Sequence, residues 1–225
     1  MSAVAPTRIA LIHAVAVAID PIRDAFAELW PEAQTFNVLD DALSVDRAAE
    51  TELSAALSER IVALGCYAHG AGAAGILYTC SAFGSAIESA ARSLPVPVLK
   101  PNEAMFLDAL AAGRRIGMLA TFEPSVASMA QEFAALAANR GSEATLEIRC
   151  VPEAMRALRA GDRPTHDALL AAEAPRLAHC DAVMLAHFST SRAHAAVSRV
   201  LAAPVLAAPR SAVVSLRRAI MAARP

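Results

Sequence analysis

The chain has 225 residues, enough for one large domain or for two domains of about 100 residues each. Its net charge of −2 leaves no basic surface of the kind that binds nucleic acid. No apolar run reaches the length of about 18 residues that a membrane-spanning helix needs, so we expect neither a nucleic-acid nor a membrane partner.

Short apolar runs alternate with longer helical patterns along the whole chain. In chain order, the runs typical of strands are 8–13, 34–39, 74–79, 97–99, 115–120, 144–150, 181–187 and 204–207. The runs typical of helices are 20–30, 47–69, 83–93, 102–112, 124–139, 153–160, 165–179, 190–201 and 209–223. This alternation predicts βαβ units, in which parallel strands are joined by right-handed crossovers.

The second half of the chain repeats the first at a constant offset. The run 8–12 returns at 115–119 (115 − 8 = 107), and the run 75–80 returns at 182–187 (187 − 80 = 107). The run 97–99 returns at 204–206, where 204 − 97 is again 107. The repeat predicts an α/β fold of two pseudo-symmetric, flavodoxin-like domains, each a parallel four-stranded sheet flanked by helices.

Ligands of parallel α/β sheets bind beyond the carboxyl ends of the strands, so these ends are where a site is expected. The residues at the strand ends are His13 and Ala14, Cys80 to Phe83, Lys100 to Asn102, Ala120 to Glu123, His187 to Thr190, and Ala207 with Ala208. If the halves face each other across a pseudo-twofold axis, Cys80 and His187 lie on opposite walls of an interdomain cleft. We therefore predict the active site in that cleft.

Cys80 is the first candidate catalytic residue. It ends an apolar strand and precedes a predicted helix, whose N–H groups and positive end are expected to lower the thiol pKa. A thiolate in that position can abstract a proton or attack an electrophilic carbon. The alternative is a buried structural cysteine, since free cysteines are among the most buried residues.

His187 is the matched residue of the second half and the second candidate. A helix begins after it, and a helix N-terminus disfavours imidazolium, so a neutral histidine that accepts a proton is expected. The alternative is a histidine that only hydrogen-bonds the substrate or the backbone. Both readings stay open on the sequence alone.

The neighbouring turns supply candidate substrate contacts. The hydroxyls of Thr121 and Ser125, together with helix N–H groups, form a potential carboxylate cradle, although Thr121 is also a plausible N-cap. His13 occupies the symmetric place in the first half and is a candidate contact for a substrate anion. The remaining candidates are Ser81, Ala82 and Ser189, in the turns whose N–H groups can stabilise negative charge.

No metal site and no cofactor are expected. Cys66 with His69, and His179 with Cys180, do not make a four-ligand zinc pattern. The chain lacks the glycine-rich nucleotide motifs, and Lys100, its one lysine, shows no sign of holding pyridoxal phosphate. The spacing of the cysteines is typical of reduced thiols, and we expect a cytoplasmic protein.

With these features, the chain resembles the aspartate/glutamate/hydantoin racemase superfamily, which includes arylmalonate decarboxylases and maleate isomerases. The resemblance is carried by the run 76–84 around Cys80, by the run 115–121 and by the strand and turn around His187. It implies cofactor-independent enzymes that bind small carboxylates between two α/β domains. It further implies that the last helix returns to the first domain, giving domains 1–99 plus 208–225 and 100–207.

The resemblance also implies chemistry, with one departure. Two-base members use one cysteine to remove an α-proton and an opposite cysteine to return one, and His187 stands where the second cysteine would be. We expect a racemase-type isomerase of a small carboxylic or amino acid in which Cys80 acts as the base or nucleophile and His187 as the partner acid. The alternatives are a decarboxylase or cis–trans isomerase that uses Cys80 alone, or a non-catalytic binder of small anions. Formation of a homo-oligomer is left open.

Overall fold

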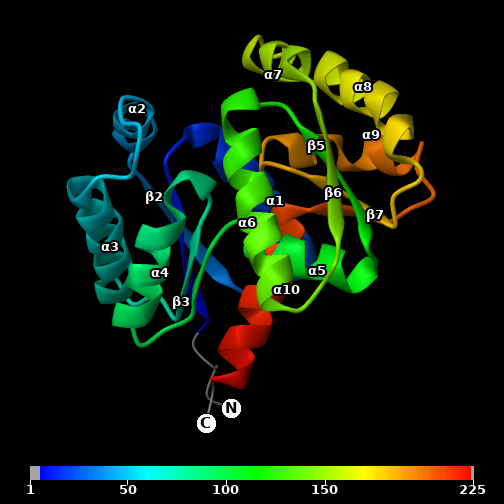
Figure 1. Cartoon of the computed structure of the whole chain (residues 1–225). Helices are drawn as coiled ribbons and strands as arrows, with labels where there is room; N and C mark the ends of the chain where they lie inside the picture. Colours follow the sequence, from blue (N-terminus) through cyan, green and yellow to red (C-terminus); the bar gives the residue numbers. More distant parts are fainter. Residues whose placement is uncertain (1–5, 224–225) are drawn as a thin grey trace. The chain divides into compact units, whose positions relative to one another are not determined.

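The computed structural model describes residues 6–223, and the described chain divides into two compact units (Figure 1). The first unit runs to Pro101 and resumes at Ala212, and the second comprises Asn102–Ser211. The expected boundaries after residues 99 and 207 refer to domains that fold independently, and they stay a prediction. Within residues 6–223, no helix is both long and apolar enough to cross a membrane.

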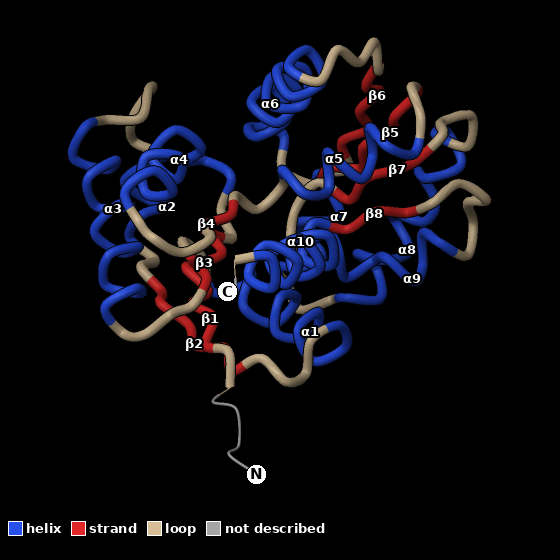
Figure 2. The backbone as a smooth tube through the Cα atoms, turned by 90° about the horizontal axis from the view of Figure 1, so that it is seen from below, coloured by secondary structure: helices blue, strands red, loops and turns tan. Residues whose placement is uncertain are grey.

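The first unit is a parallel four-stranded sheet with the order β2-β1-β3-β4. Its strands are β1 (Arg8–His13), β2 (Gln34–Leu39), β3 (Gly75–Tyr78) and β4 (Val98–Leu99). Its helices are α1 (Ile19–Leu29), α2 (Ala42–Ala48), α3 (Ala55–Gly70), α4 (Gly84–Ser93) and the part of α10 (Ala208–Ala222) that begins at Ala212. Figure 2 shows α3 and α4 on one face of this sheet, with α1 and α10 on the other.

Side-chain alternation along the strands builds a core on each face of this sheet. Ile12 and Tyr78 belong to the core that α3 and α4 cover. On the α10 side, Gly75 lets the helix approach closely: a Cβ at this position would lie 2.5 Å from Ile220 and 3.1 Å from Leu216. A glycine at the start of β3 is therefore what allows α10 to pack there.

The second unit repeats this arrangement, with the strand order β6-β5-β7-β8. Its strands are β5 (Arg115–Ala120), β6 (Thr145–Cys150), β7 (Ala182–Leu185) and β8 (Val205–Ala207). Its helices are α5 (Glu103–Ala112), α6 (Val126–Asn139), α7 (Pro152–Arg159), α8 (Arg163–Glu173) and α9 (His194–Ser198). Phe106 of α5 and Phe133 of α6 meet edge to face at 5.6 Å, and a second core lies around Leu170 and Leu177.

The two sheets have the same strand order, and three pairs of strands begin 107 residues apart (115 − 8, 182 − 75 and 205 − 98). The predicted α/β class, with two parallel four-stranded sheets flanked by helices, is confirmed. Short 3-10 turns follow the central strands in both units: η1 (Ala16–Ala18) and η2 (Ser81–Phe83) after β1 and β3, η3 (Glu123–Ser125) and η5 (Thr190–Ala193) after β5 and β7.

Three helix predictions are wrong in detail. The helix predicted over 190–201 is the 3-10 turn η5 followed by the short helix α9, which ends at Ser198. The helix predicted over 47–69 is two helices, α2 and α3, because the chain breaks before Ser54, whose side chain caps α3 by accepting the N–H of Leu57. The helix predicted over 165–179 ends at Glu173 and continues as the 3-10 turn η4 (Ala174–Leu177). Pro175 accounts for this change, since it has no N–H to continue the α-helical bonding.

Candidate active site

Cys80 lies two residues beyond β3, at the carboxyl edge of the first sheet. Its backbone is extended (φ −120°, ψ 126°), its side chain is half-buried, and η2 begins at the next residue. Burial raises the pKa of the Cys80 thiol, while the hydrogen bond from the Ala82 N–H and the charge of Arg47 act in the opposite direction. The expected lowering of this pKa is wrong, because three residues of 3-10 helix offset only part of the desolvation cost.

Consequently, the resting form of Cys80 at neutral pH is the protonated thiol. A thiol is ready to donate a proton, and it becomes a base only after it has given that proton up. Because the raised pKa makes this thiol a weaker acid than a solvent-exposed cysteine, the free protein holds the proton on the sulfur. A thiolate at this position therefore needs the substrate or a neighbouring positive charge to stabilise it.

Arg47 is a residue near Cys80 that the sequence did not single out. Its Nε donates to the Ala82 carbonyl at 3.4 Å, and its Nη1 donates to the Glu50 carbonyl at 2.8 Å. The guanidinium therefore spans from α2 to the turn that follows Cys80. Arg47 was missed because it fell at the start of the predicted helix 47–69, where charged residues normally face solvent.

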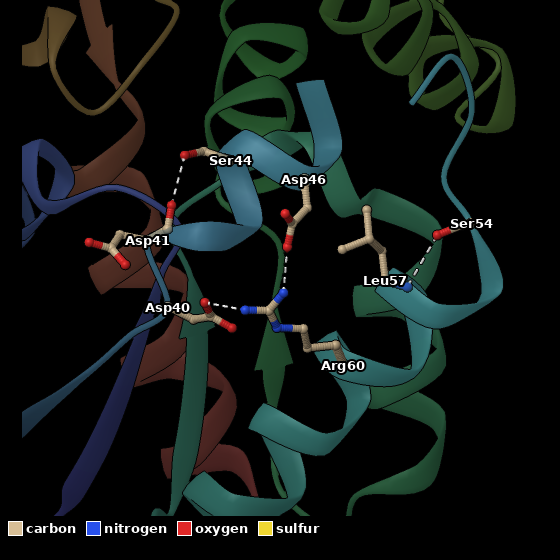
Figure 3. Close-up of polar contacts among 7 residues, drawn as sticks. All are labelled: Asp40, Asp41, Ser44, Asp46, Ser54, Leu57 and Arg60. Atoms are coloured by element: carbon tan, nitrogen blue, oxygen red, sulfur yellow. Dashed lines mark hydrogen bonds and ion pairs between the residues drawn. The ribbon is translucent and has the colours of Figure 1, made fainter. Parts of the chain in front are cut away.

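An ion-pair network holds the α2 segment that carries Arg47. Arg60 of α3 reaches Asp40 at 2.5 Å and Asp46 of α2 at 2.7 Å (Figure 3). Ser44 adds a hydrogen bond to the Asp41 carbonyl at 3.2 Å. Because Arg60 bridges the residue after β2 and a residue of α2, it fixes this helix against α3.

His13 ends β1 and is fully buried. Its Nε2 lies 2.9 Å from Asn37 Oδ1 and its Nδ1 lies 2.9 Å from Thr79 Oγ1. Since the amide oxygen of Asn37 can only accept, Nε2 carries the proton. The single proton of the Thr79 hydroxyl is then shared between His13 Nδ1 and the Ile12 carbonyl, which lies 3.3 Å away. Burial lowers the pKa of His13, opposed by the bond to Asn37. Both nitrogens have protein partners, so the predicted contact between His13 and a substrate anion stays a prediction.

His187 lies two residues beyond β7, at the carboxyl edge of the second sheet. Its Nε2 is 2.7 Å from Ser125 Oγ, and its Nδ1 is 3.5 Å from Thr190 Oγ1. The Ser125 hydroxyl also donates to the Phe122 carbonyl at 2.8 Å, so the arrangement that satisfies every bond has Nε2–H donating to Ser125. Burial lowers the pKa of His187 to about 4, and the imidazole is neutral at physiological pH.

The hydroxyls around His187 form a short chain. Thr121 is buried, and its Oγ1 lies 3.1 Å from Thr190 Oγ1, which in turn faces His187. Thus Thr121 and Ser125, predicted as a carboxylate cradle, are both linked to the histidine. Ser189 is buried in the same turn, whereas Ser81 is half-buried and Ala82 is exposed beside Cys80.

A second thiol in this unit was also missed. Cys150 ends β6, beside the end of β5, and burial together with the Glu123 carboxylate raises its pKa to about 12. Cys150 lies at the end of the outer strand β6, whereas Asn37 lies inside the outer strand β2, two residues before its end. Their signal was a chemically useful side chain in or at the end of a predicted strand.

The structure thus defines a two-unit α/β protein whose polar and titratable side chains gather at the carboxyl edges of its sheets. A model of the Asp/Glu/hydantoin racemase family matches residues 18–136, which are 119 of the 225 residues (136 − 18 + 1). The chain therefore belongs to the Asp/Glu/hydantoin racemase family, as the resemblance predicted. Comparison with curated proteins gives no match.

Solved structures of several enzymes share the fold. Aspartate racemase from Picrophilus torridus has a TM-score of 0.71 and 14% identity, covering 96% of this chain and 94% of that one. Allantoin racemase from Klebsiella pneumoniae has a TM-score of 0.69 and 17% identity, covering 96% and 88%. A mutant arylmalonate decarboxylase in a sulfate-associated form has a TM-score of 0.68 and 17% identity, covering 96% and 94%. At these identities the likeness shows the fold alone.

Proposed function

We propose that this protein is a cofactor-independent isomerase of the racemase type that moves a proton at the α-carbon of a small carboxylic acid. The single observation that carries the proposal is the placement of a protonated thiol, Cys80, at the carboxyl end of a central strand in a chain of this family. Carboxyl ends of parallel strands are where α/β proteins bind their ligands.

Cys80 is the proposed proton donor. As its S–H proton passes to the α-carbon, the sulfur takes the negative charge that the planar enediolate-like species gives up. Arg47 and the Ala82 N–H, which favour the thiolate, then stabilise the anion that remains. The cycle closes when the thiolate removes the α-proton of another substrate molecule or regains a proton from solvent.

His187 is the proposed partner of Cys80 on the same substrate. It occupies in the second unit the position that Cys80 occupies in the first, at 80 + 107 = 187. Being neutral, it can accept the α-proton at Nδ1 when the substrate displaces the Thr190 hydroxyl from its 3.5 Å contact, while the Nε2–H bond to Ser125 holds the ring in one orientation. The imidazolium formed by this step is costly in a buried site, which favours rapid return of the proton.

Backbone N–H groups are proposed to stabilise the charge on the substrate carboxylate. The turns at 81–83 and 188–190 follow the two central strands, and aligned N–H groups act on an enediolate as oxyanion holes do. Substrate contacts through Ser81, Ala82, Thr121, Ser125 and Ser189 belong to this proposal. In it, Thr121 and Ser125 also orient His187.

The test is turnover of a panel of small acids by the wild type and by matched cysteine variants. The panel includes aspartate, glutamate and an arylmalonate; chiral chromatography follows interconversion of enantiomers, and release of CO₂ follows decarboxylation. Cys80→Ala is expected to lose turnover by about 10²-fold or more, while Cys66→Ala, which removes an exposed thiol, keeps it. Wild-type rates in folded Cys80→Ala would refute the proposal, and binding without turnover in the wild type would favour a non-catalytic anion binder.

Decarboxylation by Cys80 alone is the second candidate. It is favoured by the state of the two residues, a thiol that is already protonated and a histidine whose ring nitrogens both face hydroxyls. In this reaction the C–C bond to a carboxylate breaks, CO₂ leaves, and the thiol protonates the resulting enediolate. Release of CO₂ that survives His187→Gln would select this candidate over the two-residue isomerase.

A further inference from the structure

A cluster of three metal-binding side chains lies in the second unit, away from the residues described above. Among residues 6–223, Glu147, His179 and Cys180 form the one group of three or more such side chains whose ligand atoms all lie within 4.8 Å of one another. Glu147 comes from β6, and the other two immediately precede β7. Sequence spacing could not reveal this group, because the third side chain comes from a distant strand.

The fold makes room for the cluster with a glycine. Gly117 of β5 lies opposite Glu147 in the parallel register, so the two positions face the same side of the sheet. A Cβ at Gly117 would lie 3.2 Å from the sulfur of Cys180. The missing side chain therefore leaves space over β5, in which the buried thiol sits beside the carboxylate of the outer strand.

The polar contacts already present suit a metal site. His179 Nε2 lies 3.0 Å from Glu147 Oε2, close to the edge of about 3.3 Å that two ligands of a tetrahedral zinc ion span at bond lengths near 2.05 Å. Arg149 occupies the other carboxylate oxygen, Oε1, at 2.8 Å. It leaves Oε2 for a metal and can act as the hydrogen-bonding partner that orients a ligating carboxylate.

We propose that Glu147, His179 and Cys180 bind a divalent transition metal of the zinc type, with water as the fourth ligand. Imidazole nitrogen and thiolate sulfur bind zinc in preference to magnesium or calcium. Binding exchanges the thiol proton for a metal–sulfur bond and the hydrogen bond between His179 and Glu147 for two metal bonds. Asp181 is not a ligand, because its carboxylate accepts the N–H groups of Arg114 and Arg115.

The proposed site is structural. His179 and Cys180 precede the amino end of β7, whereas Cys80, His187 and their partners gather at the carboxyl ends of strands. A metal here would tie the outer strand β6 to the segment that enters β7. The proposal is therefore independent of the proposed function, and no catalytic step depends on it.

Cobalt(II) is the probe, because its thiolate-to-metal charge-transfer band reports a Co–S bond directly. The whole, metal-free protein is titrated with Co²⁺, and Zn²⁺ is then added as competitor. We expect a charge-transfer band that saturates at one Co²⁺ per chain, disappears on addition of Zn²⁺ and is absent in Cys180→Ser. Affinity should fall about 10-fold or more in His179→Gln and Glu147→Ala, with far-ultraviolet circular dichroism checking that each variant is folded.

A matched control separates this site from incidental metal binding. Cys66 and His69 are a second cysteine and histidine that are close together in the sequence, both on α3. The double variant Cys66→Ser/His69→Gln should leave the titration unchanged. His179 is exposed, so its variant tests the site even if replacement of the buried Cys180 harms folding. The proposal is overturned if no charge-transfer band forms, if it persists in folded Cys180→Ser, or if only the control variant abolishes it.

Discussion

The protonation state of His187 is a property of the site that can be perturbed cleanly. Burial lowers the pKa of His187 from 6.5 to about 4, so the folded protein holds it neutral where an unfolded chain would begin to protonate it. Between these two pH values the unfolded state binds more protons, and stability must fall as the pH falls from 6.5 toward 4. Above pH 6.5 this contribution is fully present, and below about 4 it is lost.

The size of the effect follows from the two pKa values. A difference from 6.5 to about 4, at 1.36 kcal/mol for each pH unit, corresponds to about 3 kcal/mol of unfolding free energy for the unit that contains His187. His187→Gln removes the titrating group and should flatten the pH dependence by up to that amount. Ser125→Ala is the matched control, because it removes the hydrogen bond to Nε2 but leaves the histidine buried.

Two assays report the result. Urea unfolding at several pH values between 7.5 and 4.5 gives the slope for each variant, and NMR of the imidazole Cε1–H groups gives the titration itself. The chain has six histidines, so the signal absent in His187→Gln identifies the residue. A His187 midpoint at or above 6.5 in the folded protein would refute the reasoning that burial keeps this imidazole neutral.

Three further predictions concern the first unit. Arg47→Gln should raise the pKa of Cys80 further, since the charge of Arg47 lowers it. Iodoacetamide should then alkylate Cys80 several-fold more slowly at pH 8. An unchanged rate contradicts this role of Arg47, and Arg23→Gln is the control. Gly65→Ala should lower the free energy of unfolding in urea by about 1–3 kcal/mol, because the new Cβ would lie 2.7 Å from the Tyr78 hydroxyl. Its control is Gly70→Ala, whose Cβ would have nothing within 4 Å and should not destabilise the protein. Tyr78→Phe should cost about 1–3 kcal/mol, measured in the same way, because it leaves the buried Ile61 carbonyl without the 2.7 Å hydrogen bond from the hydroxyl.

Most strands could be predicted to within a residue or two because their signal is local. The predicted 8–13, 34–39 and 115–120 match β1, β2 and β5. β1 and β5 are buried parallel strands, which are short apolar runs between polar turns. The constant offset of 107 then gave the repeated architecture. The helix pattern was less decisive at 47–69, where alanine continues through the break before Ser54.

The environment of the candidate residues could not be predicted in the same way. The raised pKa of Cys80 depends on how much water is excluded from the thiol, which no neighbouring residue in the sequence encodes. The approach of Ser125 to His187 joins residues 62 positions apart. Arg47 lies close in space to the turn after Cys80 only because Arg60 and two aspartates hold α2 in place.

The most direct test of the central claim is exchange of the substrate α-hydrogen with solvent deuterium, followed by proton NMR. A substrate found in the panel is incubated in D₂O with the wild type, Cys80→Ser and Cys66→Ser. The account predicts deuterium at the α-carbon with the wild type and Cys66→Ser, in recovered substrate for an isomerase or only in product for a decarboxylase. It predicts exchange slower by about 10²-fold or more with Cys80→Ser. Exchange at the wild-type rate in a folded Cys80→Ser protein would contradict it.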